Sequence, residues 1–150
     1  MIRHTLLATA ATAALAMPAA AERVVKVSPH SVEQTMDRLV AAVTGAGATV
    51  FARVDHAAGA AKAEMELRPT QVLIFGNPKL GTPAMLDGQT AGLDLPLRVL
   101  AYVDGEGVVQ VTYHAPTGLA AVHGLPADAA YLAKMTGALD KLTSKAIAED

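Results

Sequence analysis

Apolar residues recur at the spacing of an α-helix in two long stretches of the chain. The first stripe is Val32, Met36, Leu39, Val40 and Val43, and the second is Leu132, Met135, Leu139, Leu142 and Ala146. Before the first stripe, Ser31 and Gln34 have the spacing of a capping box, and Gly45 and Gly47 follow it. Pro126 and Asp128 are expected to open the second helix. The pattern predicts two amphipathic helices, each with one face against a core.

Shorter stretches have the pattern of β-strands, and they are residues 23–27, 48–54, 72–75, 97–103 and 108–114. The run at residues 72–75 is apolar throughout, which predicts a strand buried on both faces. Asp104-Gly105-Glu106-Gly107 is expected to join the last two strands as a hairpin turn. These strands are the expected sheet of the domain.

The remaining connections contain short helices and loops. Asp55 can cap an alanine-rich helix from His56 to near Ala63, and Thr82-Pro83 can begin another that runs through Leu86. Residues 119–125 are expected to be a linking segment. This order of elements predicts an α+β fold, with a two-layer, mainly antiparallel sheet of about five strands and two long helices on one face.

The first 21 residues have the features of a secretory signal peptide. Arg3 and His4 precede an apolar run, and the segment ends in Ala19-Ala20-Ala21, so cleavage is expected between Ala21 and Glu22. The apolar run has only about a dozen residues, whereas a helix needs about 20 to span a bilayer. We therefore expect residues 22–150 to be a single exported domain, periplasmic in a bacterium, without a membrane span.

Composition narrows the chemistry of this domain. The chain has no Cys, so disulfides, thiol chemistry and Cys-based metal or haem-attachment sites are excluded. The formal net charge of −2 disfavours nucleic acid as a partner. With two Phe, three Tyr and no Trp in the 150 residues, the core must be built from aliphatic side chains and Met.

Several segments carry a resemblance to a known family. They are Asp55-His56-Ala57-Ala58, Arg68-Pro69-Thr70, Leu73-Ile74-Phe75-Gly76-Asn77-Pro78-Lys79, Gly81-Thr82-Pro83 with Met85, and Gly92-Leu93-Asp94-Leu95-Pro96-Leu97. Through them the chain resembles the bacterial and archaeal domain-of-unknown-function family 302 (DUF302). The resemblance implies a β-α-β4-α fold similar to that of the TATA-binding protein. This likeness does not imply DNA binding, and the family brings no established activity. This chain has Glu64 where relatives usually end the short helix with Gly.

The connection from Gly76 to Thr82 is the first candidate site. Asn77, Lys79 and Thr82 lie there near backbone N–H groups that could bind an anion. The alternative is a tight turn in which Gly, Pro and Asn serve only the backbone geometry.

Histidine and aspartate provide the other candidates. His56 follows Asp55 at a helix start and could act as a base or, with His114 or His123, as a metal ligand. Alternatively it only caps its helix or hydrogen-bonds to the loop after Phe75. Asp94 lies in an apolar segment, where it could be a tuned acid or base. Alternatively it accepts backbone N–H bonds and fixes the connection to the next strand, and Arg98 or Lys79 could form an ion pair with it.

These observations favour a small-ligand-binding or interaction module over an enzyme. The ligand would lie where the Asn77–Thr82 connection, His56 and Asp94 approach one another, since the unusual residues are on connections. The alternative is a small enzyme, or a metal- or haem-binding redox accessory, that uses His56 and Asp94. A homodimer formed through a sheet edge is a third possibility.

Overall fold

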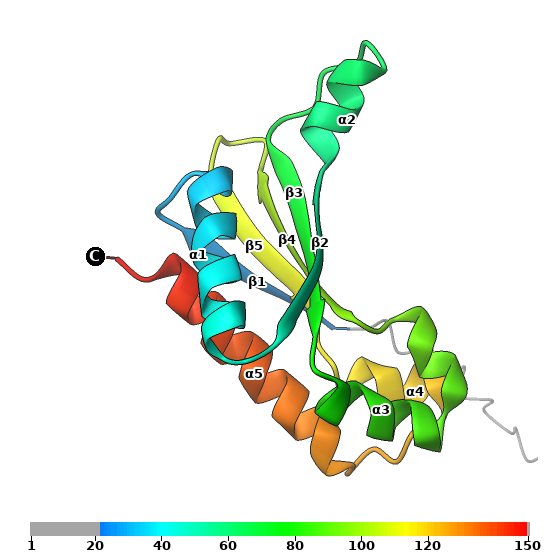
Figure 1. Cartoon of the computed structure of the whole chain (residues 1–150). Helices are drawn as coiled ribbons and strands as arrows, with labels where there is room; N and C mark the ends of the chain where they lie inside the picture. The colour runs from blue at the N-terminus through cyan, green and yellow to red at the C-terminus, as the bar shows by residue number, and fades with distance from the viewer. Residues whose placement is uncertain (1–21, 150) are drawn as a thin grey trace, which may run out of the picture.

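Two long helices, α1 (Val32–Gly45) and α5 (Ala130–Ile147), lie side by side on one face of a sheet (Figure 1). The computed structural model describes residues 22–149, so the predicted signal peptide lies outside the described residues. The sheet consists of β1 (Arg23–Ser28), β2 (Thr49–Asp55), β3 (Thr70–Gly76), β4 (Leu97–Val103) and β5 (Val109–His114). The connections contain α2 (His56–Lys62), α3 (Pro78–Asp87), the 3₁₀ helix η1 (Gln89–Leu93) and α4 (Gly118–His123).

The strands have the order β1-β5-β4-β3-β2, and all neighbours are antiparallel. This confirms the predicted α+β class, the five-stranded sheet and the two helices on one face. The predicted capping box is also present, because Ser31 and Gln34 exchange hydrogen bonds of 3.2 Å between side chain and backbone. Asp55 caps α2 as expected, accepting a 2.9 Å bond from the backbone N–H of Ala58.

The main core lies between the two helices and the sheet. Leu39 of α1 and Leu139 of α5 are almost fully buried against Leu73 and Val99 of the sheet. Among residues 22–149, no helix covers the opposite face (Figure 1), where Val25 and Val27 of β1 are 45% and 59% exposed.

The prediction that residues 72–75 are buried on both faces is therefore wrong. Leu73 and Phe75 of β3 are buried, but Val72 and Ile74 are only partly buried because they point to the uncovered face of the sheet. An apolar run shows that a strand is inside a sheet, and it does not show how many layers cover that sheet.

Three predicted boundaries also differ. α3 begins at Pro78 rather than at Thr82, because Asn77 is its N-cap and accepts a 2.9 Å bond from the N–H of Lys79. The predicted linking segment at 119–125 instead contains most of α4. α5 begins at Ala130, two residues after Asp128.

A second, smaller core holds α3, η1, α4 and the first half of α5 together at one end of the sheet. Its members are Ala84, Ala91, Leu125, Tyr131, Leu132 and Met135. α2 projects from the opposite end (Figure 1). The molecule therefore has two different ends, and the short helices at the α3 end enclose the cavities that are described below.

Glu64, at the end of α2, has a left-handed backbone with φ of 57°. The N–H groups of Glu64 and Met65 bond the carbonyls of Ala61 and Ala60 at 3.1 and 3.0 Å, which is a Schellman ending. That conformation costs an ordinary residue about 1–2 kcal/mol and costs glycine almost nothing.

We therefore expect Glu64→Gly to raise the free energy of unfolding by about 1 kcal/mol, measured by urea denaturation. Glu64→Ala is the matched control, because it removes the same carboxylate and keeps the strained backbone. An equal gain in both variants would mean that the charge, and not the backbone, is responsible.

Candidate functional site

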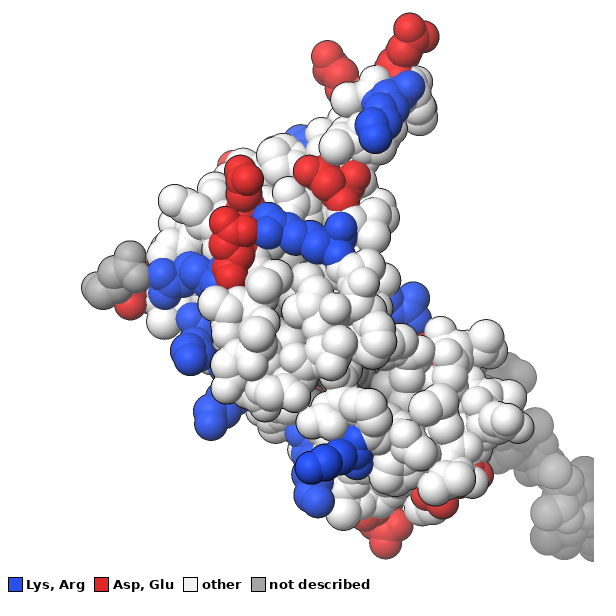
Figure 2. Space-filling model, in the orientation of Figure 1, with Lys and Arg blue, Asp and Glu red and all other residues white. Residues whose placement is uncertain are grey.

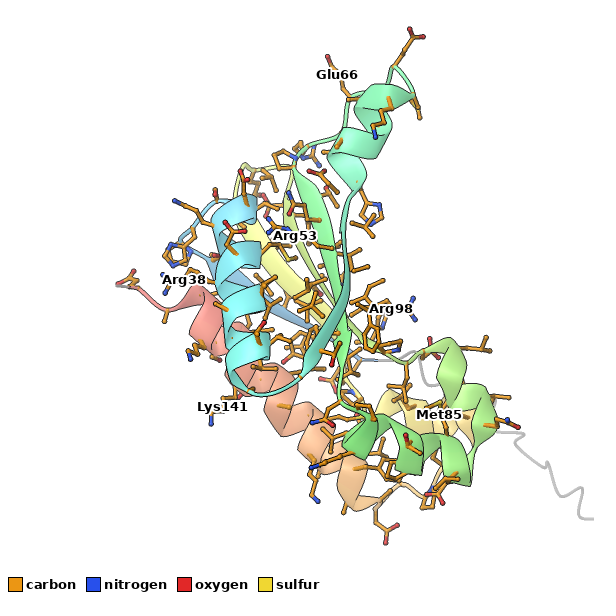
Figure 3. All side chains as sticks on the ribbon, in the orientation of Figure 1. Arg38, Arg53, Glu66, Met85, Arg98 and Lys141 are labelled. Carbon is orange, nitrogen blue, oxygen red and sulfur yellow. The ribbon has the colours of Figure 1, made fainter. Side chains whose placement is uncertain are left out.

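A cavity of about 240 Å³ lies at the corner where β3 ends and α3 begins. We call it the corner cavity. Its walls come from β2, α3, the segment Leu95-Pro96 before β4, and α5. Most of the lining residues are apolar, and they include Phe51, Leu80, Met85, Leu95, Leu97 and Met135. Met85 lies in the second half of α3 (Figure 3).

Local sequence shapes this corner. A Cβ on Gly76 would lie 3.3 Å from Cβ of Pro96, so glycine allows the end of β3 to approach Pro96 closely. On β2, the pairing with β3 shifts between Val50 and Ala52, which leaves Phe51 between them. The Phe51 side chain is 58% exposed and contributes to the cavity wall. The apolar wall therefore extends out to a solvent-exposed aromatic ring.

Two polar side chains line the corner cavity, Asn77 and Thr82. The Asn77 Oδ1 atom is used by the cap of α3, which leaves its NH₂ group without a hydrogen bond within residues 22–149. The Thr82 hydroxyl also has no partner in that range. No acidic, basic or histidine side chain is among the residues that line the cavity. The cavity is suited to a neutral, mainly apolar molecule with one hydrogen-bonding group.

The surface around this corner is partly uncharged. Figure 2 shows a white area over the lower ends of β2 and β3 and over part of α3, with basic side chains directly below it and further acidic and basic side chains at α2 and at the upper end of α1.

The structure divides the five residues that the sequence proposed as one site. Asn77 and Thr82 line the corner cavity, but Lys79 does not, although it is on the exposed first turn of α3. His56 begins α2 at the other end of the sheet (Figure 1). Asp94 lines a second cavity, described below. His56 and Asp94 are not brought together, so the structure gives no support to joint chemistry by these two residues.

Asp94 has partners on two sides. Its Oδ2 atom lies 2.7 Å from Nε2 of His123, whose side chain is only 4% exposed, and its Oδ1 atom lies 3.3 Å from the Arg98 guanidinium. The other ring nitrogen of His123 is 3.1 Å from the Thr90 hydroxyl. The expected Asp94–Arg98 ion pair is confirmed, and the contact with His123 was not predicted.

The three candidate metal ligands, His56, His114 and His123, do not form a cluster. Within residues 22–149, no group of three His, Cys, Asp or Glu side chains lies close enough together to hold a metal ion. Both ring nitrogens of His123 are already hydrogen-bonded.

A family model and a solved structure both match this chain. A family model described as "Domain of unknown function DUF302" matches residues 24–142. The chain belongs to the DUF302 family. A crystal structure of an uncharacterized conserved DUF302 protein from Bacillus stearothermophilus superposes with a TM-score of 0.74, covering 83% of this chain and 97% of that one at 17% identity. At that identity the likeness is evidence for the DUF302 fold alone.

Curated relatives of this DUF302 chain are longer proteins. A protein of Brucella suis and one of Brucella melitensis, both described as fluoride-specific ion channels, are 49% identical to it over 112 residues. The match covers 73% of this chain but only 44% and 42% of theirs, so it spans less than half of these relatives. In the described part of the DUF302 chain, no helix is long and apolar enough to cross a membrane.

Most of the corner cavity of this DUF302 domain could not be found from the sequence. Phe51, Met85 and Met135 are apolar residues whose spacing only predicts burial in a core. The only usable signal was the Gly76-Asn77-Pro78 turn, which located the corner without its walls.

Two side chains outside the corner cavity have shifted pKa values. Burial, with a hydrogen bond to Asp87, raises the pKa of Tyr131. In the β4–β5 hairpin, the hydrogen bond from Gln110 lowers the pKa of Asp104 first, and the Val108 N–H adds to this. The folded Asp104 carboxyl therefore holds its proton less tightly than the unfolded one.

The lowered pKa of Asp104 predicts a pH-dependent contribution to stability. The contribution is fully present above the unfolded pKa, near 3.8, and is lost as the pH falls through the lower folded pKa. The difference in unfolding free energy between wild type and Asp104→Asn should therefore grow from pH 2 to pH 5, measured by urea denaturation. Glu106→Gln is the control in the same turn, and an equal pH dependence in both variants would contradict the assignment.

Proposed function

We propose that this DUF302 domain binds a small, neutral and mainly apolar molecule in the corner cavity. The observation that carries the proposal is an apolar hollow with two unpaired hydrogen-bonding groups, the Asn77 amide and the Thr82 hydroxyl, among its lining residues. Asn77 is half-buried and Thr82 is exposed, so both groups reach solvent, and a ligand in the cavity could bond them in place of water.

The volume of the corner cavity supports a ligand of limited size. An engineered apolar cavity of about 150 Å³ is large enough to bind benzene. The corner cavity, at about 240 Å³, could hold a single aromatic ring with a short substituent. Benzyl alcohol is a suitable probe, because its ring fits the apolar walls and its hydroxyl could bond Asn77 or Thr82.

Filling the cavity should abolish binding of benzyl alcohol. Gly81 lines the cavity and is inside α3, where a Cβ would make only an ordinary contact of 3.8 Å with Leu95. A leucine side chain at this position would occupy the apolar space and would favour the helix. We expect Gly81→Leu to weaken binding of benzyl alcohol by about tenfold or more, measured by amide NMR titration.

Gly59→Leu is the matched control, because Gly59 is on α2 with no atom near its Cβ position. It should bind benzyl alcohol as the wild type does. Equal binding by wild type and Gly81→Leu would remove the corner cavity as the ligand site.

We further propose that the domain is exported. The support is the basic start, apolar run and Ala19-Ala20-Ala21 ending of the sequence. N-terminal sequencing of the protein isolated from the cell envelope fraction should begin at Glu22. A protein that retains Met1 in the cytoplasm would contradict export.

Self-association remains a separate proposal. β1 and β2 are the edge strands of the sheet, so either could pair with the same strand of a second copy. Light scattering of the purified domain should then give twice the monomer mass, and a monomer at all concentrations would contradict it.

A second candidate function is that of an accessory domain for a membrane ion channel. The Brucella relatives favour it, because the matched region makes up less than half of longer chains that are described as fluoride-specific ion channels. Deleting this chain should then lower the fluoride concentration at which the cells stop growing, and restoring it should reverse the effect. Unchanged fluoride tolerance would contradict this candidate.

A further inference from the structure

A second cavity, of about 420 Å³, lies at the end of β4 and β5 beside α4. Asp94, Arg98 and His114 line it together with apolar residues, among them Leu97, Leu119 and Val122. Leu97 also lines the corner cavity, so the two cavities are neighbours. They differ in chemistry, because only the second one has charged side chains.

Basic side chains form a row across the strands at this cavity. Leu100 of β4 faces Thr112 of β5, and continuing that antiparallel pairing by two residues places Arg98 opposite His114. On the other side of β5, Arg23 of β1 faces His114. Facing residues of an antiparallel pair point to the same side of a sheet. Figure 3 shows Arg98 on the side away from α1 and α5.

Arg98 is held in position but keeps free N–H groups. Its Nη2 atom donates to the Leu93 carbonyl at 3.2 Å and to Asp94 Oδ1 at 3.3 Å. Asp94 is fixed in turn by the buried ring of His123 at 2.7 Å. Within residues 22–149, Nε and Nη1 of Arg98 have no hydrogen-bond partner.

The other two members of the row are also unengaged. Neither the His114 ring nor the Arg23 guanidinium has a hydrogen bond or an ion pair within the described range. The cavity thus combines the positioned Arg98 guanidinium and the unpaired His114 ring with an apolar wall, and Arg23 lies next to His114 on β1, outside the cavity lining. A guanidinium group with free N–H groups makes strong, charge-assisted hydrogen bonds to a carboxylate.

We propose that the second cavity binds a small organic carboxylate. The carboxylate is bound by Arg98 and His114, with Arg23 adding positive charge, and the apolar body of the ligand lies against Leu97, Leu119 and Val122. The volume is within the usual range of roughly 300–1,000 Å³ for small-molecule sites. Asp94 and His123 are positioning residues that orient the guanidinium.

Benzoate is the probe that tests this proposal, with benzamide as its neutral analogue. Amide NMR titration of residues 22–150 should show shifts at Arg98, His114 and Leu119 with benzoate and much smaller ones with benzamide. Arg98→Gln should weaken benzoate binding by about tenfold or more. Shifts confined to α3, or equal binding of the two probes, would overturn the proposal.

A second variant keeps the test independent of Arg98. Val122 is 59% exposed, so Val122→Glu should leave the fold intact while adding a negative charge that repels the carboxylate of the ligand. It should abolish benzoate binding, whereas Leu86→Glu, at an 81% exposed position outside both cavities, should not. Unchanged binding in Val122→Glu, or phosphate binding as tightly as benzoate, would also overturn the proposal.

Discussion

Gly88→Ala should lower the free energy of unfolding by about 2–3 kcal/mol. A Cβ on Gly88 would lie 2.6 Å from Cδ2 of Leu125 and 2.8 Å from the backbone carbonyl oxygen of His123. The leucine methyl could move, but the carbonyl is part of the end of α4. The added methyl must therefore push the junction of α3 and η1 away from the end of α4, at the small core that bounds both cavities. Urea denaturation of the two proteins measures the loss.

Gly137→Ala is the matched control for this substitution. Gly137 is inside α5, and a Cβ there would have no atom within 4 Å. The same added methyl should stabilise the protein by roughly 0.5–1 kcal/mol, because glycine weakens a helix interior. If Gly88→Ala were as stable as wild type, the close approach of Gly88 to the end of α4 would be wrong.

Leu39→Ala should have the other large effect, a loss of about 2–5 kcal/mol of unfolding free energy. Leu39 is fully buried in the core cluster that joins α1 to α5 and to the sheet. Removing its methyl groups takes away apolar burial and leaves a cavity that helices fixed on a sheet cannot fully close.

The control for Leu39→Ala is the same substitution at Leu86, which is 81% exposed on α3. Leu86→Ala should change the unfolding free energy by less than about 0.5 kcal/mol. Comparable losses at the two positions would mean that the helices do not pack on the sheet as described.

Elements fixed by local chemistry could be predicted from the sequence. Ser31 and Gln34 specify the start of α1 by a capping box, Asp55 specifies the start of α2, and Asp104–Gly107 specifies the hairpin. In each case the interacting residues are within a few positions of one another, so the pattern contains the whole interaction. The α+β class followed from the order of these elements.

A short helix and the exposure of one face of the sheet were missed. α4 has only six residues, too few for a helical period to appear. The exposure of the other face of the sheet was missed although both long helices were predicted on one side, because the apolar run at residues 72–75 does not show how many layers cover the strand.

The candidate site was predictable only in part. The Asp94–Arg98 pair is four residues apart and was expected, whereas the Asp94–His123 contact is 29 residues apart and was not. The proposed grouping of His56 with Asp94 failed to appear because α2 projects from the end of the sheet opposite α3 and α4 (Figure 1). Met135 joins the corner cavity only through the packing of α5 against α3.

The most direct test of ligand binding in the corner cavity uses the methionine methyl groups of the mature domain. Met85 and Met135 line the cavity, while Met36 is buried in the main core and Met65, shortly after α2, is 62% exposed. With ¹³C-methyl methionine, toluene should shift the signals of Met85 and Met135, show nuclear Overhauser contacts to both, and leave Met36 and Met65 unchanged. Unchanged Met85 and Met135 signals at saturating toluene, or contacts to Met65 alone, would contradict the account.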